Sequence, residues 1–452
     1  MRASNRGKVL PRWLFRLSLR PERSAFGRDA GTAMSDRHPG GPSNDRDGAK
    51  ARNGICRRAA LVAGVFLALA VVVPGEGVAS AREPNWTGTW AVAVSRDNTG
   101  KTFTDQTLRQ IVRISVGGKR VRLRISNLFG TQPLRVEDVH LAMRRSGSSI
   151  VASSDRQLLF GGSSKLVIPA GATAFSDPLA LDLPALSELA VSIYLPGSTG
   201  PVNFHGAGHE ATYIQAGDAS GALQMEHADS TRSVYFLDGV ELEAASLRGT
   251  IVALGASITE GYSAADDTGH RWPDQLAHRL ASHGLPIGVL NLGVSGNKLL
   301  VNGSGESAEN RFERDVLQQP NVRWVVFSDD PINDLGSRPS PSGEALIAAL
   351  KRLIWRAHEA KIRFVCSTLT PFEGARSWTP AEEQERQKVN DFIRGAGSGC
   401  DGIVDQDAAT HDPVHPSQFL APYDHGDHLH PNDAGHKAIA DSIDLRLFSG
   451  EQ

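Results

Sequence analysis

The sequence predicts a chain of two parts, an all-β region followed by an α/β region built on a parallel sheet. Between Trp86 and about Ala245, short β-prone runs are separated by Gly, Ser, Asn, Asp and Pro. From Ile251 onward, apolar runs of strand length alternate with stretches of helical periodicity. Strands that alternate with helices indicate a parallel sheet with helices on both faces. At 452 residues, 40% apolar and 22% charged, the chain is long enough for two globular domains.

In the first part, strand character is strongest in six runs. Apolar and polar residues alternate in 121–125 and in 189–193, as a sheet with one buried face requires. We therefore expect an all-β sandwich or jelly roll. The six runs cover residues 109–116, 120–126, 136–143, 165–168, 188–195 and 233–242.

Aromatic and histidine residues of this part are candidates for a sugar-binding surface, because aromatic faces stack on the apolar faces of sugar rings. They are Trp86, Trp90, His205, His209 and Tyr213. Residues of these types more often fill cores and interfaces, and we prefer that interpretation. We find no group of residues suited to catalysis in this part, so the chemistry is expected in the second.

The second part has a regular order of strands and helices. The linker before it, about residues 244–248, is short, so we expect the two parts to pack together. In parallel sheets, ligands bind at the carboxyl ends of the strands, and the polar motifs of this part fall at these ends. Strands are expected at 251–254, 287–292, 322–327, 362–369 and 402–404, and helices at 272–283, 342–360, 381–394 and 432–447.

The polar motifs together supply the groups that acyl transfer requires. Acyl transfer needs a nucleophile, an imidazole base oriented by a carboxylate, and donors for the oxyanion. Ser257, in the turn after the first strand, is by itself more typical of a helix cap. Its interpretation as the nucleophile is favoured by four residues at later strand ends. His430 and Asp427 lie before the last helix, and Gly296 and Asn333 follow the second and third strands.

These motifs resemble the sequence blocks of the SGNH or GDSL hydrolase family. The resemblance covers about residues 250–447 and extends to exported members with an amino-terminal β domain, grouped around rumen xylan-associated arylesterases and acylhydrolases. The blocks occur in family order. They are Gly255-Ala256-Ser257-Ile258 for the serine block, Gly296 for the glycine block, Asn333-Asp334 for the asparagine block, and Asp427 with His430 for the last.

The resemblance implies a three-layer, flavodoxin-like hydrolase domain that needs no cofactor and no metal. It implies Ser257 as nucleophile, His430 as general base and then acid, and Asp427 as the orienting carboxylate. The backbone N–H groups of Ser257 and Gly296 and the Asn333 amide would form the oxyanion hole. Expected substrates are short acetyl or aryl esters, on small molecules or on plant polysaccharide. Lysophospholipids or thioesters are alternatives within the family.

The sequence departs from the family pattern at two positions. Ala256 stands where the family has Asp, which removes an acceptor expected to brace the turn. Pro331 stands where the family has Gly, and proline fixes φ and lacks an N–H, so the loop of Asn333 is expected to be reshaped. We expect activity to persist because all the chemical groups remain. A glycan-binding protein with a weakened hydrolase part is the alternative.

Other chemistries can be drawn from the same segments. Residues 424–430 are rich in His and Asp, which bind zinc, but no second cluster accompanies them, so a metal mechanism ranks lower. Ser295 is a rival nucleophile, yet Asn297 stands where a nucleophile elbow needs glycine. We therefore expect Ser295 to support the turn at Gly296. Asp334 is expected to stabilise its loop through hydrogen bonds.

The amino terminus has the three parts of an export signal. Arg57-Arg58, the apolar block 59–73 and the small residues 79–81 match its charged, apolar and cleavage regions. We expect cleavage near Ala81 and a periplasmic or secreted protein without stable membrane insertion. An uncleaved amino-terminal anchor is the alternative. The leader before Arg57 is long for a signal, so the true start is open.

The expected domains are a leader at 1–81, a β-sandwich-like accessory domain at 82–247 and the hydrolase domain at 248–452. The leader would remove 14 of the 48 Lys and Arg and 6 of the 50 Asp and Glu, leaving a balance of about −10. This charge argues against a nucleic-acid partner. Export would permit a disulfide between Cys366 and Cys400, but a buried thiol is the preferred interpretation for Cys366. The sequence leaves the oligomeric state open.

Overall fold

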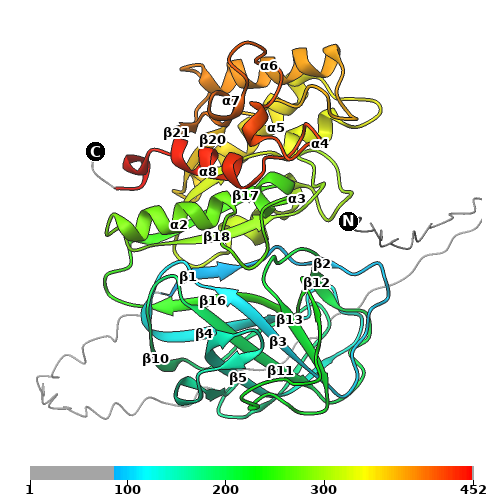
Figure 1. The fold of residues 1–452 in the computed structure, drawn as a ribbon, viewed down its shortest axis with the longest axis vertical. Coiled ribbons are helices and arrows are strands. Elements are labelled where there is room, and N and C mark those ends of the chain that lie inside the picture. Colours follow the sequence, from blue (N-terminus) through cyan, green and yellow to red (C-terminus); the bar gives the residue numbers. More distant parts are fainter. Residues whose placement is uncertain (1–85, 450–452) are drawn as a thin grey trace, which may run out of the picture. The chain divides into compact units, whose positions relative to one another are not determined.

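The computed structural model describes residues 86–449 of the chain (Figure 1). The expected leader, its cleavage site near Ala81 and the alternative anchor lie outside the described residues. None of the helices between residues 86 and 449 combines the length and apolar character that a membrane span requires.

The amino-terminal part consists of antiparallel strands. These are β1 (Trp86–Ala91), β2 (Ser95–Arg96), β3 (Gln106–Arg113), β4 (Gly118–Ser126), β5 (Leu134–Ser146), β6 (Ser149–Ile150), β7 (Arg156–Leu158), β8 (Lys165–Ile168), β9 (Thr173–Phe175), β10 (Leu179–Leu183), β11 (Glu188–Leu195), β12 (Asn203–His205), β13 (Thr212–Ala216), β14 (Asp229–Thr231), β15 (Val234–Tyr235) and β16 (Leu237–Glu243). The sheets have the orders β1-β16-β4-β10, β14-β13-β3-β11-β5-β6 and β15-β12-β2, with β9 beside β4 and with β7 and β8 beside β5. All six predicted runs overlap these strands, with ends that differ by a few residues.

Strand β4 shows why this part folds as packed sheets. Val121, Leu123 and Ile125 are fully buried in a core that the two larger sheets share. The residues between them, Arg122 and Arg124, point away from that core and pair with carboxylates of β16. The alternation in the sequence therefore separates a buried apolar face from a face of ion pairs.

The candidate sugar-binding residues of the β-rich part are largely buried. Trp86, Trp90, His205 and His209 expose 8, 8, 4 and 9% of their surface, and Tyr213 is half-buried. Their preferred interpretation as core and interface residues is therefore confirmed.

The carboxyl-terminal part is built on a parallel sheet of the order β18-β17-β19-β20-β21 (Figure 1). Counted along the chain this order is 2-1-3-4-5, which flavodoxin-like sheets share. The strands are β17 (Gly249–Gly255), β18 (Ile287–Gly293), β19 (Val322–Phe327), β20 (Arg363–Ser367) and β21 (Gly402–Val404). All of them coincide with predicted strands.

The helices of this part are of two kinds. Those of ten residues or more were predicted from their periodicity, and α2 packs on β18 while α5 packs on β20. The shorter ones were not predicted. The helices are α1 (Ser257–Glu260), α2 (Trp272–Ser282), α3 (Ala308–Phe312) continued by the π-helical turn η2 (Glu313–Leu317), α4 (Asp330–Leu335), α5 (Gly343–Glu359), α6 (Pro380–Arg394), α7 (Gln406–Thr410) and α8 (Asp433–Ser442).

The last helix and the cysteines differ from expectation. Helix α8 ends at Ser442 rather than near residue 447, because Ile443 takes an extended conformation and Asp444 caps a separate turn, η4 (Leu445–Phe448). Cys366 and Cys400 form a disulfide, with Cα atoms 5.8 Å apart, so the free-thiol interpretation is wrong. Burial of Cys366 was read correctly, but burial does not distinguish a thiol from a disulfide.

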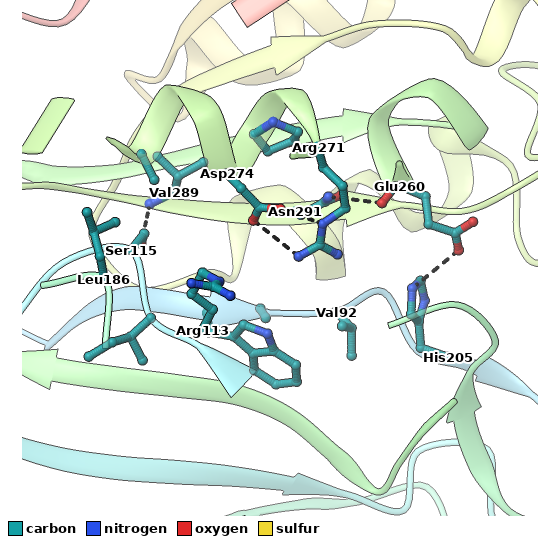
Figure 2. Close-up of a pocket in the computed structure, with 15 residues that line it drawn as sticks. Val92, Arg113, Ser115, Leu186, His205, Glu260, Arg271, Asp274, Val289 and Asn291 are labelled. Carbon is teal, nitrogen blue, oxygen red and sulfur yellow. Dashed lines mark hydrogen bonds and ion pairs between the residues drawn. The ribbon is translucent and has the colours of Figure 1, made fainter. Parts of the chain in front are cut away.

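The two parts pack against each other, as the short linker predicts. The Gly88 N–H donates to Thr250 Oγ1 at 3.1 Å, and the Val289 N–H donates to Ser115 Oγ at 2.8 Å (Figure 2). Strand β1 lies along β18. A cavity of about 30 Å³ remains between the two parts, with room for about one water molecule.

Candidate active site

The turn after β17 presents Ser257 at the carboxyl end of this strand, which lies between β18 and β19. Ser257 is 7% exposed, and its Oγ lies 2.8 Å from His430 Nε2. Only glycine fits two residues earlier, because a Cβ on Gly255 would lie 2.1 Å from Thr259 Oγ1. The hydroxyl and the imidazole are therefore within hydrogen-bond distance in the folded chain.

A buried carboxylate from the next strand end braces this turn. Asp329 accepts the N–H groups of Ala256 at 3.0 Å and Ile258 at 2.8 Å, and the hydroxyl of Thr259 at 2.7 Å. Asp329 is 2% exposed. We expected Ala256 to leave the turn without an acceptor, and this expectation is wrong because Asp329 supplies one from β19.

His430 and Asp427 lie in one loop, before α8, and contact each other directly. His430 Nδ1 is 2.6 Å from Asp427 Oδ2, while Asp427 Oδ1 accepts the N–H groups of Leu429 and His430. Burial alone would raise the pKa of Asp427, but the hydrogen bonds from His430 and Leu429 outweigh it and hold the pKa below its usual value. The charged carboxylate favours a proton on Nδ1, which leaves Nε2 to face the Ser257 hydroxyl.

Tyr262 holds the other side of the imidazole. Its ring lies 4.3 Å from that of His430, centroid to centroid, and its N–H donates to the Ser257 carbonyl at 2.8 Å. The packed ring restricts rotation of His430. Tyr262 is 47% exposed, so it also faces solvent beside the site.

Gly296 and Asn333 lie on two segments that are hydrogen-bonded to each other. Asn333 Nδ2 donates to the Asn297 carbonyl at 2.9 Å, and Gly296 has a φ of 74°, which glycine adopts without strain. Between residues 86 and 449, no hydrogen bond joins Gly296 or Asn333 to Ser257. Pro331 lies in the first turn of α4, where an N–H is not needed.

Asp334 stabilises the same segments, as predicted. Its carboxylate accepts the N–H groups of Leu299 at 2.5 Å and Leu300 at 3.2 Å. Burial raises its pKa to about 6, against the lowering effect of these two N–H groups.

Arg311 is a buried residue of the site that the sequence analysis missed. It is 1% exposed and donates to the carbonyl oxygens of Gly255 at 2.9 Å and Leu292 at 2.6 Å, and to Asn297 Oδ1 at 3.0 Å. It thus ties together the ends of β17 and β18 and the loop after Gly296. The only sequence signal is its spacing, because Arg311 lies three residues after Ala308 and directly before Phe312, the other two buried residues of α3.

The rival groups have other partners. Ser295 is bound to Glu260: its hydroxyl and, at 3.2 Å, its N–H both donate to Glu260 Oε2. Asp424 pairs with His428 at 2.6 Å. Over residues 86–449, no three His, Cys, Asp or Glu side chains are grouped so as to hold a metal ion.

Comparisons with known proteins concern the carboxyl-terminal part. Residues 253–438 match the model of the GDSL-like Lipase/Acylhydrolase family. No curated protein matches the chain.

Solved structures resemble slightly less than half of the chain. One is Axe2, an acetylxylan esterase from Geobacillus stearothermophilus, with 23% identity and a TM-score of 0.35 over 45% of this chain and 95% of that one. Another is LAE5, an alpha/beta hydrolase enzyme from the metagenome of Lake Arreo. It has 21% identity and a TM-score of 0.34, and the match covers 44% of this chain and 95% of that one. A GDSL-like lipase from Bacteroides thetaiotaomicron VPI-5482 has 17% identity and a TM-score of 0.33, and the match covers 44% of this chain and 87% of that one.

The family match begins within β17 and ends within α8, so it spans the parallel sheet and includes both Ser257 and His430. The resemblance stated from the sequence motifs is thereby confirmed. Residues 253–438 therefore carry a domain that matches the GDSL-like lipase/acylhydrolase family, and this match supports a carboxylic ester hydrolase.

Proposed function

We propose that the protein is a serine esterase that cleaves short acetyl or aryl esters through an acyl-enzyme. The observation that carries the proposal is the continuous line of Ser257 Oγ, the His430 ring and Asp427, with separations of 2.8 and 2.6 Å. Nucleophile, base and orienting carboxylate in hydrogen-bond contact are what acyl transfer requires.

In the first half-reaction, Ser257 Oγ attacks the ester carbonyl carbon while His430 Nε2 takes its proton. The tetrahedral intermediate collapses, the bond to the alcohol oxygen breaks, and His430 returns the proton to the departing alcohol. In the second half, His430 deprotonates a water molecule that attacks the acyl-enzyme, which releases the acid and restores Ser257. Asp427 stabilises the imidazolium formed in each half.

The oxyanion of both intermediates needs hydrogen-bond donors. We assign the backbone N–H groups of Ser257 and Gly296 and the Asn333 amide to this role. Asn333 Nδ2 donates to a single carbonyl, that of Asn297, and its second proton is available for substrate. Arg311 and Asp334 support the assignment, because they fix the segments that carry these donors.

We also propose the domain limits and location expected from the sequence. Residues 82–247 would be an accessory domain and 248–452 the hydrolase domain, exported after cleavage near Ala81. Amino-terminal sequencing of the mature protein from medium and periplasm tests this, since a start far from residue 82 would refute it.

A chromogenic acyl-ester series tests the proposed reaction. Nitrophenyl esters from acetate to octanoate should be hydrolysed fastest at the short end, and Ser257→Ala should lose nearly all activity. Ser295→Ala, at the rival nucleophile, should retain turnover well above that of Ser257→Ala. Equal rates for wild type and Ser257→Ala would overturn the serine mechanism, and an optimum at octanoate would favour a lysophospholipid or thioester substrate.

A further inference from the structure

An open groove runs beside the candidate active site and is bounded by both parts of the chain. Its volume is about 770 Å³, within the usual range for ligand sites. The β-rich part supplies one wall and the hydrolase part the other. The residues that matter here are Arg96, Phe129 and Phe204 on the first wall and Tyr262, Ser304 and Glu306 on the second.

Two residues of the groove lie next to the reacting groups. Tyr262 lines it and packs on His430, and Ser304 lines it and lies against Gly296, where an added Cβ would come within 2.7 Å of Ser304 Oγ. A substrate whose ester carbonyl sits at Ser257 would therefore extend its remaining part along this groove.

The lining chemistry suits a sugar chain with a negative charge. Phe129, Phe204 and Tyr262 offer aromatic faces for sugar rings. Glu306 is paired with Arg314, and Glu260 contacts His205 and Ser295. Arg96 is exposed, and among residues 86–449 it has no ionic or side-chain hydrogen-bond partner. The uncompensated charge of the groove is thus positive.

We propose that the groove binds the alcohol part of the ester, an acylated oligosaccharide that carries a uronic acid carboxylate, with Arg96 as its partner. The β-rich part is then half of the substrate site. This inference rests on the proposed esterase function. A guanidinium and a carboxylate form strong, paired hydrogen bonds, which a neutral sugar cannot offer.

The test uses the full chain with Arg96→Gln and the matched control Arg145→Gln, an exposed arginine of β5 that does not line the groove. Substrates are nitrophenyl acetate and acetylated xylo-oligosaccharides with and without a glucuronic acid branch. Arg96→Gln should raise KM at least about fivefold for the acidic oligosaccharide only. The control should change nothing.

Two outcomes distinguish a failure of this inference from a failure of the proposed esterase function. If Arg96→Gln changes KM equally for neutral and acidic oligosaccharides, or changes it for neither, the groove assignment is wrong. The esterase function would still stand in that case, provided that nitrophenyl acetate is cleaved. Absence of nitrophenyl acetate hydrolysis by wild type would overturn the esterase function itself.

A second inference comes from a chain of polar contacts that links the β-rich part to the oxyanion loop, of which Figure 2 shows the contact between His205 and Glu260. His205 Nδ1 faces the Ala93 carbonyl at 2.9 Å and His205 Nε2 faces Glu260 Oε1 at 3.3 Å. A carbonyl only accepts, so Nδ1 carries a proton, and Nε2 is the ring nitrogen that faces the Glu260 carboxyl. Glu260 in turn accepts from Ser295, the residue before Gly296.

The geometry points to His205 as a positioning residue that acts through Glu260 on the Gly296 N–H. Both His205 and Glu260 are 4% exposed, so the contact between them is shielded from water. A displaced oxyanion donor slows the chemical step far more than substrate binding.

The test compares His205→Leu, which removes the polar contact with Glu260, with His205→Gln, whose amide can restore a polar contact there. His205→Leu should lower kcat on nitrophenyl acetate at least about tenfold with KM nearly unchanged, and His205→Gln should recover most of it. Glu260→Gln, at the other end of the contact, should lower kcat as well. Melting temperatures are measured alongside, and variants equal in kcat after correction for folded fraction would overturn the role.

Discussion

Replacing Asp329 with Asn should loosen the turn that carries Ser257. The carboxylate receives two bonds on Oδ1, from Ala256 and Thr259, and one on Oδ2, from Ile258. The Asn side chain keeps only one acceptor oxygen. Its NH₂ group, which is a donor, then faces a backbone N–H of the turn, which is also a donor. One charge-assisted bond is lost and one buried donor is left unpaired, which together cost about 2–4 kcal/mol. A shift of the turn by about 1 Å would lower kcat roughly a hundredfold.

Urea unfolding and steady-state hydrolysis of nitrophenyl acetate measure the two effects. The matched control is Asp412→Asn, since Asp412 also accepts two backbone N–H groups, of Val414 and His415, but lies in an outer loop. The control should leave stability and kcat unchanged. Asp329→Asn with wild-type kcat would refute the argument that this carboxylate holds the nucleophile turn.

Three further changes follow from the structure. Asn333→Ala removes one proposed oxyanion donor and should raise the barrier by on the order of 3 kcal/mol, seen in kcat; an unchanged kcat would exclude the role. Burial raises the pKa of Asp330 to about 7, with Arg311 only partly opposing it. The stability that the protonated carboxyl contributes is fully present below about pH 4 and is lost as the pH rises to about 7. The free energy of unfolding of Asp330→Asn should therefore rise relative to that of wild type between about pH 4 and 7, as measured by urea unfolding; a constant difference over this range would contradict this. Reduction of the disulfide, whose cysteines are 34 residues apart, should cost about 3–4 kcal/mol, and thermal melts of Cys400→Ser should no longer respond to the reductant.

The longer elements were predictable because their side chains repeat with the period of the structure. Helix α5 has Leu346, Leu350 and Leu353 on one buried face, and Ser342 caps its start. Helices such as α1 and α4 have four and six residues, too few to show a period. They form because the strand ends and the buried carboxylates around them hold the chain.

The site was predictable only where a motif carried it. Ser257, Asp427 and His430 were named from local patterns, and the structure brings them within hydrogen-bond distance. Asp329 and Arg311 were missed because they act on residues 73 and 56 positions away, a pairing that only the fold creates.

The central claim is that Ser257 attacks the ester and becomes acylated. Intact and peptide mass spectrometry after treatment with an organophosphate, or after rapid quenching with nitrophenyl acetate, measures this directly. We expect one adduct per chain, on the peptide that contains Ser257, and none on Ser257→Ala. Modification of Ser295 instead, or full inhibition without an adduct on Ser257, would contradict it.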